Sequence, residues 1–251
     1  MHPQSRWEKP RFEWRASVAD RSPISCIYVL AGTNGAGKSS VGGAMLVQRG
    51  VEYFNPDQAA IEIRFANPGI TNEEANSAAW RQGRRLLERA IAERLHFAFE
   101  TTLGGHTITS LLESALPVGV DVRIWYVGLS SPELHIARVH SRVARGGHDI
   151  PDTKIRERYD RSRLNLIQLM PKLTELRVYD NSQEADPHAG VAPEPTLILH
   201  LARARIVSSC ALTDTPEWAK PILRAAIRHR AATVRERRAA TSKTSRGQEI
   251  S

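Results

Sequence analysis

The fold of this chain is decided by residues 24–39, which read ISCIYVLAGTNGAGKS. Residues 24–30 form a short, almost continuous apolar run rich in β-forming side chains, which is typical of a strand buried on both faces. The residues that follow, from Gly32 to Ser39, match the pattern G-x-x-x-x-G-K-S/T in full. A helix is expected from Lys38 to about Arg49, ended by Gly50. A strand before the glycine-rich loop and a helix after it are the context that a P-loop requires.

A loop of this kind holds phosphate groups. Its glycines let backbone N–H groups converge on an anion, and the helix dipole adds positive potential at the same point. We expect Lys38 to reach the β- and γ-phosphates of a nucleoside triphosphate, and the Ser39 hydroxyl to bind Mg²⁺. The predicted ATP-binding residues are Gly32, Thr33, Asn34, Gly35, Ala36, Gly37, Lys38, Ser39 and Ser40.

Outside this segment, short apolar runs alternate with helical patterns. Strands are predicted over 24–30, 51–54, 96–101, 122–129 and 176–179, with further edge strands over 196–200 and 205–207. Helices are predicted over 58–66, 71–95, 107–116, 130–145 and 155–169. Strands that alternate with helices indicate a parallel sheet covered on both faces. The predicted fold is therefore α/β, a P-loop NTPase/kinase-like three-layer sandwich with a mostly parallel central sheet.

The charge is distributed unevenly along the chain. Of the formal net charge of +8, residues 217–251 carry +6 and residues 1–22 carry +2, so the body is neutral. A neutral body argues against a core that tracks nucleic acid. We therefore expect a basic, aromatic N-terminal extension over 1–22, a P-loop kinase domain over 23–216 and a basic C-terminal helix and tail over 217–251. The absence of a long apolar run predicts no membrane span, and two distant cysteines favour the cytoplasm.

Polar residues at predicted strand ends are the candidates for chemistry. In a parallel sheet the working side chains project from the carboxyl ends of the strands. Asp57 follows the second predicted strand, where it would accept a proton from an attacking hydroxyl or, alternatively, cap the next helix. Glu100, Thr101 and Thr102 end the third strand and would contact the acceptor, with Glu100 also suited to hold Mg²⁺ through water.

Arginines crowd the segment around Gly146-Gly147-His148. Arg138, Arg142 and Arg145 share one helical face before it, and Arg158 and Arg161 are neighbours after it. Guanidinium groups suit a transferring phosphate, and a helix–Gly-Gly–helix segment is able to close as a lid. We expect two or three of the arginines to contact phosphate and the others to lie on the surface. For His148, an ordering hydrogen bond is favoured over catalysis.

Together these motifs resemble the zeta-toxin family of P-loop kinases. The matching pieces are residues 31–40, Asn55-Pro56-Asp57, Phe99-Glu100-Thr101-Thr102, residues 146–151, Arg158-Tyr159 and residues 179–182. The resemblance implies ATP-dependent phosphorylation of a hydroxyl of a nucleotide sugar, UDP-N-acetylglucosamine, and an antitoxin that silences the enzyme. It also implies phosphorylation of other nucleotide-linked acceptors, such as NAD, in related branches.

The resemblance assigns roles to individual residues. Lys38 would be the phosphate lysine, and Asp57 the catalytic base. Glu100 and Thr102 would contact the acceptor. Arg142 or Arg145, together with Arg158, would clamp the phosphates. Better-known members carry an acidic acceptor-binding residue on the helix before the third strand, whereas Arg84 and Arg85 stand in that register here.

Two other functions fit the same sequence. One is a nucleotide-binding regulatory module that docks on nucleic acid or an acidic partner through its basic C-terminus. The other is a metabolic kinase on the same scaffold, without toxicity.

Overall fold

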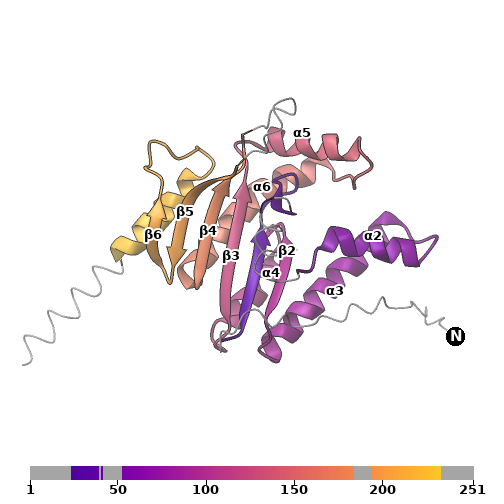
Figure 1. The fold of residues 1–251 in the computed structure, drawn as a ribbon, viewed down its shortest axis with the longest axis horizontal. Helices are drawn as coiled ribbons and strands as arrows, with labels where there is room; N and C mark the ends of the chain where they lie inside the picture. The colour runs from indigo at the N-terminus through magenta and orange to yellow at the C-terminus, as the bar shows by residue number, and fades with distance from the viewer. Residues whose placement is uncertain (1–23, 40, 42–52, 184–193, 233–251) are drawn as a thin grey trace, which may run out of the picture.

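A six-stranded sheet organises the computed structural model, which describes residues 24–39, 41, 53–183 and 194–232 (Figure 1). The strand order is β2-β1-β3-β4-β5-β6. The first four strands pair in parallel, and β5 and β6 join them antiparallel. The strands are β1 (Cys26–Ala31), β2 (Phe97–Thr101), β3 (Asp121–Gly128), β4 (Glu175–Asp180), β5 (Thr196–Ala202) and β6 (Arg205–Ser209). The predicted α/β fold with a mostly parallel sheet is confirmed, although of the two predicted edge strands only β6 lies at an edge, and β5 lies inside the sheet.

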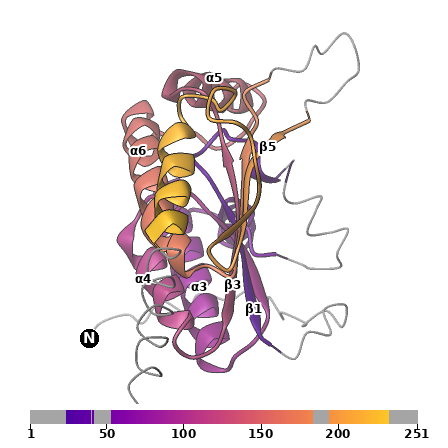
Figure 2. The same ribbon diagram turned by 90° about the vertical axis from the view of Figure 1, so that its left-hand side faces the viewer.

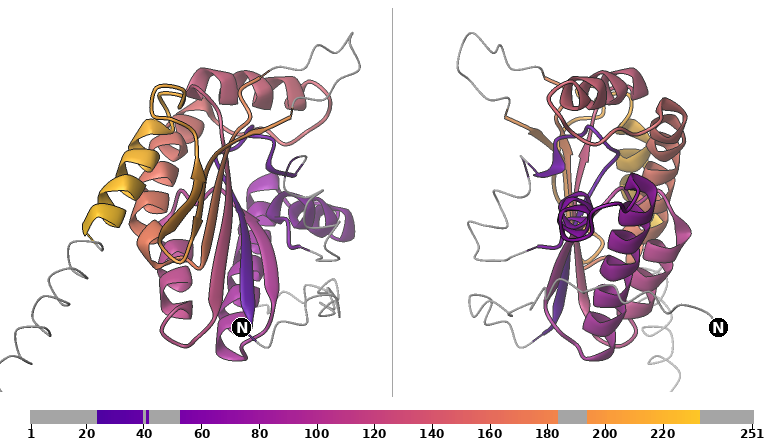
Figure 3. Two further views of the ribbon diagram at one scale, coloured as in Figure 1. Left: turned by 60° about the vertical axis from the view of Figure 1, so that its left-hand side comes forward. Right: turned by 90° about the vertical axis from the view of Figure 1, so that its right-hand side faces the viewer.

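Helices cover one face of this sheet and its upper edge. In Figure 2, α3, α4, α6 and a C-terminal helix over residues 220–232 lie on one side, and α5 crosses above the strand ends. Beyond the β2 edge, α2 packs against α3 (Figure 3). The helices are α2 (Pro56–Ala66), α3 (Asn72–Ala92), α4 (His106–Ala115), α5 (Pro132–Val143) and α6 (Asp152–Leu169), the last continued by the short helix η2 (Met170–Lys172). No helix in these described ranges is long and apolar enough to cross a bilayer.

Successive side chains of β1 enter two different cores, as the period of a strand requires. Ile27 and Val29 pack with the helices, whereas Tyr28 and Leu30 belong to a smaller cluster on the opposite face. The helix predicted over 38–49 falls almost wholly outside the described residues, and so do residues 51 and 52 of the strand predicted over 51–54. Phe54 makes one parallel bridge with Phe99 of β2.

The C-terminal helix is part of the main core. Trp218, Ile222 and Leu223 are buried against the sheet together with α6 residues. The Trp218 ring lies where a side chain at Gly128 of β3 would be, since an added Cβ there would come 2.3 Å from Cη2. The expected boundary at residue 217 therefore does not coincide with the edge of the core, because apolar burial continues past it.

Candidate functional site

The phosphate loop leaves the centre of the sheet at the end of β1. Gly35 and Gly37 have φ angles of +82° and +81°, a region that favours glycine. A Cβ at Gly35 would lie 2.5 Å from the carbonyl oxygen of His135, and a Cβ at Gly37 would lie 2.6 Å from Nδ2 of Asn181. Both glycines are therefore required by conformation and by space. Ser40, the last of the predicted ATP-binding residues, lies outside the described residues.

Two side chains from distant elements support this loop from behind. Asn181, just after β4, donates from Nδ2 to the carbonyl of Ala36 at 2.9 Å. His135 of α5 bonds through Nδ1 to the carbonyl of Asn34 at 2.8 Å. Burial lowers the pKa of His135 from 6.5 to about 4, against the opposing effect of that bond. The imidazole is therefore neutral near pH 7, and its Nδ1 carries the proton donated to Asn34.

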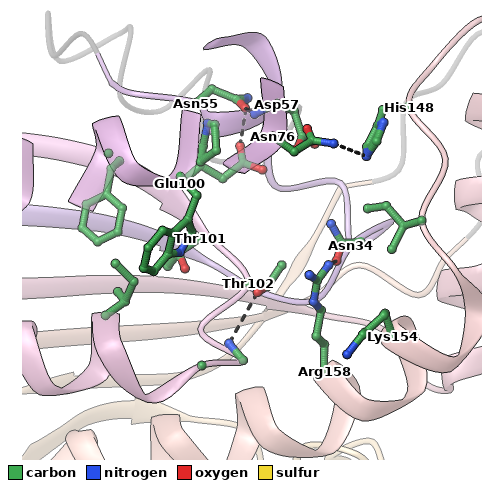
Figure 4. Close-up of a pocket in the computed structure, with 18 of the residues that line it drawn as sticks. Asn34, Asn55, Asp57, Asn76, Glu100, Thr101, Thr102, His148, Lys154 and Arg158 are labelled. Carbon is green, nitrogen blue, oxygen red and sulfur yellow. Dashed lines mark hydrogen bonds between the residues drawn. The ribbon is translucent and has the colours of Figure 1, made fainter. Parts of the chain in front are cut away.

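Glu100, at the end of β2, connects the phosphate loop to the neighbouring strand end. Its Oε1 lies 3.5 Å from Nζ of Lys38, and its Oε2 accepts from the Ser39 hydroxyl at 2.8 Å. Asn55 donates to the same Oε2 at 3.4 Å (Figure 4). Lys38 is only 6% exposed and also donates to the carbonyl of Thr33. A carboxylate, an ammonium group and a hydroxyl thus converge at the end of the glycine-rich loop.

Asp57 lies in the first turn of α2, on the same sheet edge as the loop. Asn55, not Asp57, caps this helix, because its Oδ1 accepts from the backbone N–H groups of Asp57 and Gln58. The Asp57 carboxylate is therefore not used as the cap. Its Oδ2 lies 3.7 Å from Nη1 of Arg142, and both side chains are about 40% exposed, so the pair is solvent-screened.

One cleft of about 640 Å³ brings these groups together. Asn34 and Lys38 of the phosphate loop line it, as do Asp57 and Glu100. The predicted acceptor residues Thr101 and Thr102 also line it. Their hydroxyls accept the backbone N–H groups of Leu103 and Gly104 and so shape the turn after β2. The residues that the strand-end rule selected therefore line one cleft.

The predicted arginines separate into three groups. Arg158 of α6 donates from Nη1 to the Asn34 side chain at 2.8 Å and faces the cleft (Figure 4). Burial lowers its pKa, and the nearby charge of Asp57 opposes this effect. Arg142 lies between two partners: its Nη1 faces Asp57, and its Nη2 donates a hydrogen bond to the carbonyl of His148 at 2.9 Å. Arg145, in the turn after α5, instead bonds to Ser141 of that helix and does not line the cleft.

Other basic residues of this segment hold the structure together. Arg161 pairs with Glu157 on α6, and both side chains also line the cleft. Arg138 donates to the carbonyl of Gln183. His148 bonds through Nε2 to Nδ2 of Asn76 at 3.2 Å and so ties the segment between α5 and α6 to α3. This agrees with the ordering role that the sequence favoured for His148.

Sequence reasoning missed the residues that support the loop. His135 and Asn34 are 101 positions apart, and a single histidine in a helical pattern carries no signal of such a contact. Ser162 was also missed: it accepts from the buried hydroxyl of Tyr126 and donates to the carbonyl of Thr102 at 2.7 Å. Asn181 was part of a matching motif, but its role as a support for the loop was not foreseen.

Comparison with known proteins identifies a matching family and a relative of known sequence. The family model described as Zeta toxin matches residues 13–189. An uncharacterized protein of Haemophilus influenzae is 32% identical over 129 residues, which are 51% of this chain and 88% of that protein.

Solved structures share the fold at low sequence identity. A chain of the AvrRxo1-ORF1:ORF2 complex with ATP has a TM-score of 0.58 and 13% sequence identity. The match covers 81% of the present protein and 64% of the AvrRxo1 chain. A structure of the PezAT chromosomal toxin–antitoxin system of Streptococcus pneumoniae has a TM-score of 0.52 and 11% identity, covering 88% of this chain and 91% of its own.

Proposed function

The chain belongs to the zeta-toxin family, and from this premise we propose that it is an ATP-dependent kinase for a hydroxyl of a nucleotide-linked acceptor. UDP-N-acetylglucosamine is the leading acceptor, and NAD is the alternative. The observation that carries the proposal is that Lys38 of the phosphate loop and Asp57 of the neighbouring strand end line one cleft, which Glu100, in contact with Lys38, also lines.

The loop side of the cleft suits the triphosphate donor. Backbone N–H groups of the loop and Nζ of Lys38 would hold the β- and γ-phosphates. Arg158, fixed by Asn34 beside the loop, would neutralise charge on the transferring group. The relative of the same fold solved with ATP supports this choice of donor.

The oxygen atoms next to Lys38 suit Mg²⁺. The Ser39 hydroxyl and a Glu100 carboxylate oxygen lie 2.8 Å apart, and Mg²⁺ takes oxygen ligands, commonly one or two carboxylates completed by water and phosphate. These two residues would hold the ion, which when bound neutralises charge on the phosphate oxygens.

The acceptor side of the cleft suits a hydroxyl nucleophile. Asp57 would take the hydroxyl proton as the acceptor oxygen bonds to the γ-phosphorus, and the bond from that phosphorus to the bridging oxygen of ADP would break. Thr102 and Thr101, at the end of β2, would orient the acceptor. Catalysis would come mainly from positioning and from charge neutralisation.

The family also suggests a partner. The toxin–antitoxin relative of the same fold supports an antitoxin that holds this enzyme inactive. Because ATP and nucleotide sugars are cytoplasmic metabolites, we place the reaction in the cytoplasm.

The test is transfer of the γ-phosphoryl group of labelled ATP to a panel of nucleotide sugars and dinucleotides. We expect transfer by the wild type, and a loss of at least 100-fold in Lys38→Ala and in Asp57→Asn. Lys172→Ala and Asp214→Asn are matched controls, because both side chains are exposed and outside the cleft. Binding of ATP without transfer to any acceptor would instead support the regulatory module, and full activity of Asp57→Asn would refute the assignment of the base.

A further inference from the structure

The cleft extends well beyond Asp57, along one face of α3. The residues of α3 that line it follow helical spacing and are Asn76, Ser77, Trp80, Gly83 and Arg84. Among the described residues of the phosphate loop, Asn34 and Lys38 line the same cleft, whose volume is about 640 Å³. This volume lies within the range of roughly 300–1,000 Å³ that is typical of sites for ligands of drug size.

Trp80 offers an aromatic surface in this part of the cleft. It lines the cleft and is 44% exposed, whereas Trp125 and Trp218 are buried in the core. Its neighbour Gly83 packs against the ring of Phe54, so closely that an added Cβ would come 2.6 Å from Cε1. This contact fixes α3 against the strand end and so fixes the position of the indole. A half-exposed indole on a cleft wall is suited to stack on a flat ring, as bases stack on aromatic side chains.

Arg84 places a positive charge one helical turn after the indole. Its Nε donates to Glu88 at 2.8 Å, an i,i+4 contact that orients the guanidinium. A guanidinium held through Nε still has two terminal nitrogens with which to bind an anion such as phosphate. Arg85, the next residue, is exposed and does not line the cleft.

We propose that Trp80 and Arg84 form the acceptor-recognition subsite, in which the indole stacks on the base of a nucleoside diphosphate group and the guanidinium binds its phosphates. The proposal rests on the kinase function above and specifies the acceptor. The hydroxyl to be phosphorylated must belong to a molecule that also carries an aromatic base and a phosphate. Where the family resemblance led us to expect an acidic contact on this helix, the chain has a cationic one.

Binding measured without turnover tests the subsite directly. With the donor site filled by a saturating non-hydrolysable ATP analogue, UDP and uridine are titrated by calorimetry into the full-length protein. Trp80→Ala is expected to weaken UDP binding about tenfold, since stacking contributes roughly 1–3 kcal/mol per base. Arg84→Ala should weaken UDP binding by a similar factor and leave uridine binding unchanged, because uridine has no phosphate.

Matched controls and a kinetic measurement complete the test. Phe65→Ala removes a 90% exposed aromatic side chain of α2, and Arg85→Ala removes the arginine next to Arg84; both should leave UDP binding unchanged. In the transfer assay, the two subsite variants should raise the KM of the acceptor and not that of ATP.

The outcomes separate this proposal from the kinase assignment. If the wild type transfers phosphate while Trp80→Ala and Arg84→Ala keep the wild-type UDP affinity and acceptor KM, the subsite is refuted and the kinase stands. If UDP binding depends on both residues but no acceptor is phosphorylated, the subsite is supported and the kinase assignment fails.

Discussion

The buried imidazole of His135 makes the stability of the protein depend on pH. The side chain is 1% exposed and donates to the carbonyl of Asn34, and burial lowers its pKa from 6.5 to about 4. The charges of Lys38, Arg138 and Arg163 lower it further. The unfolded chain takes up a proton near pH 6.5, whereas the folded chain resists doing so until about pH 4. The stabilisation is therefore complete above pH 6.5 and is lost as the pH falls toward 4.

The size of the loss follows from the two pKa values. Linkage gives about 2 kcal/mol of lost stability at pH 5 and about 3 kcal/mol at pH 4, relative to pH 7.5. The melting temperature should fall by about 2–4 °C per kcal/mol in a domain of this size. Because carboxylates also titrate below pH 5, the informative quantity is the difference between the wild type and a variant.

His135→Asn keeps a side-chain N–H donor and removes the titrating group. The free energy of unfolding is measured with urea at several pH values between 7.5 and 4.5. Between pH 7.5 and pH 5 it should fall by about 2 kcal/mol less in the variant than in the wild type. His140→Asn, which removes a half-exposed histidine of the same helix, should retain it. Parallel curves for the wild type and His135→Asn would refute the reasoning, because they would mean that the imidazole titrates equally in both states.

Two further substitutions test the geometry of the phosphate loop. Gly35→Ala should destabilise the protein by at least about 1–2 kcal/mol and abolish ATP binding, since its positive φ and the nearby carbonyl of His135 exclude a side chain. Gly105→Ala should cost less, because an added Cβ there meets nothing within 4 Å and only the N-cap of α4 is changed. Equal unfolding midpoints for the two variants would contradict this account. Glu100→Gln should raise the Mg²⁺ concentration needed for half-maximal transfer by roughly 10–100-fold, because Ser39 loses its charged partner; an unchanged Mg²⁺ titration would remove Glu100 from the ion's site.

Local patterns were sufficient to predict the sheet and the loop. A P-loop between a buried strand and a helix is recognised from neighbouring residues alone. The alternation of strands with helices then indicates a parallel sheet, because crossover connections are almost always right-handed. The rule that carboxyl ends of parallel strands share one edge then predicted that Asp57 and Glu100 lie at the same edge as Lys38, and the three residues line one cleft. The family match confirms the prediction of a P-loop kinase of the zeta-toxin type.

Contacts between distant helices were beyond such rules. Whether Asp57 or Asn55 caps α2 depends on side-chain geometry. Which of the arginines reaches Asp57 depends on where α5 ends relative to the cleft. Arg142 and Arg145 are three residues apart, yet Arg142 reaches Asp57, whereas Arg145, in the turn after α5, bonds back to Ser141. The wall formed by α3 required the tertiary arrangement before Trp80 was recognised as part of the cleft.

The position of Trp218 has a practical consequence for engineering this protein. Its indole N–H donates to Asp180 at 2.8 Å, and the adjacent Asn181 supports the phosphate loop through Ala36. Truncation from the carboxyl end should therefore preserve the affinity for nucleotide only if Trp218 and the buried residues that follow it, Ile222 and Leu223, are kept. Shortened versions for crystallisation or labelling should end after residue 232, and a cut at 217 would disable the donor site from a distance.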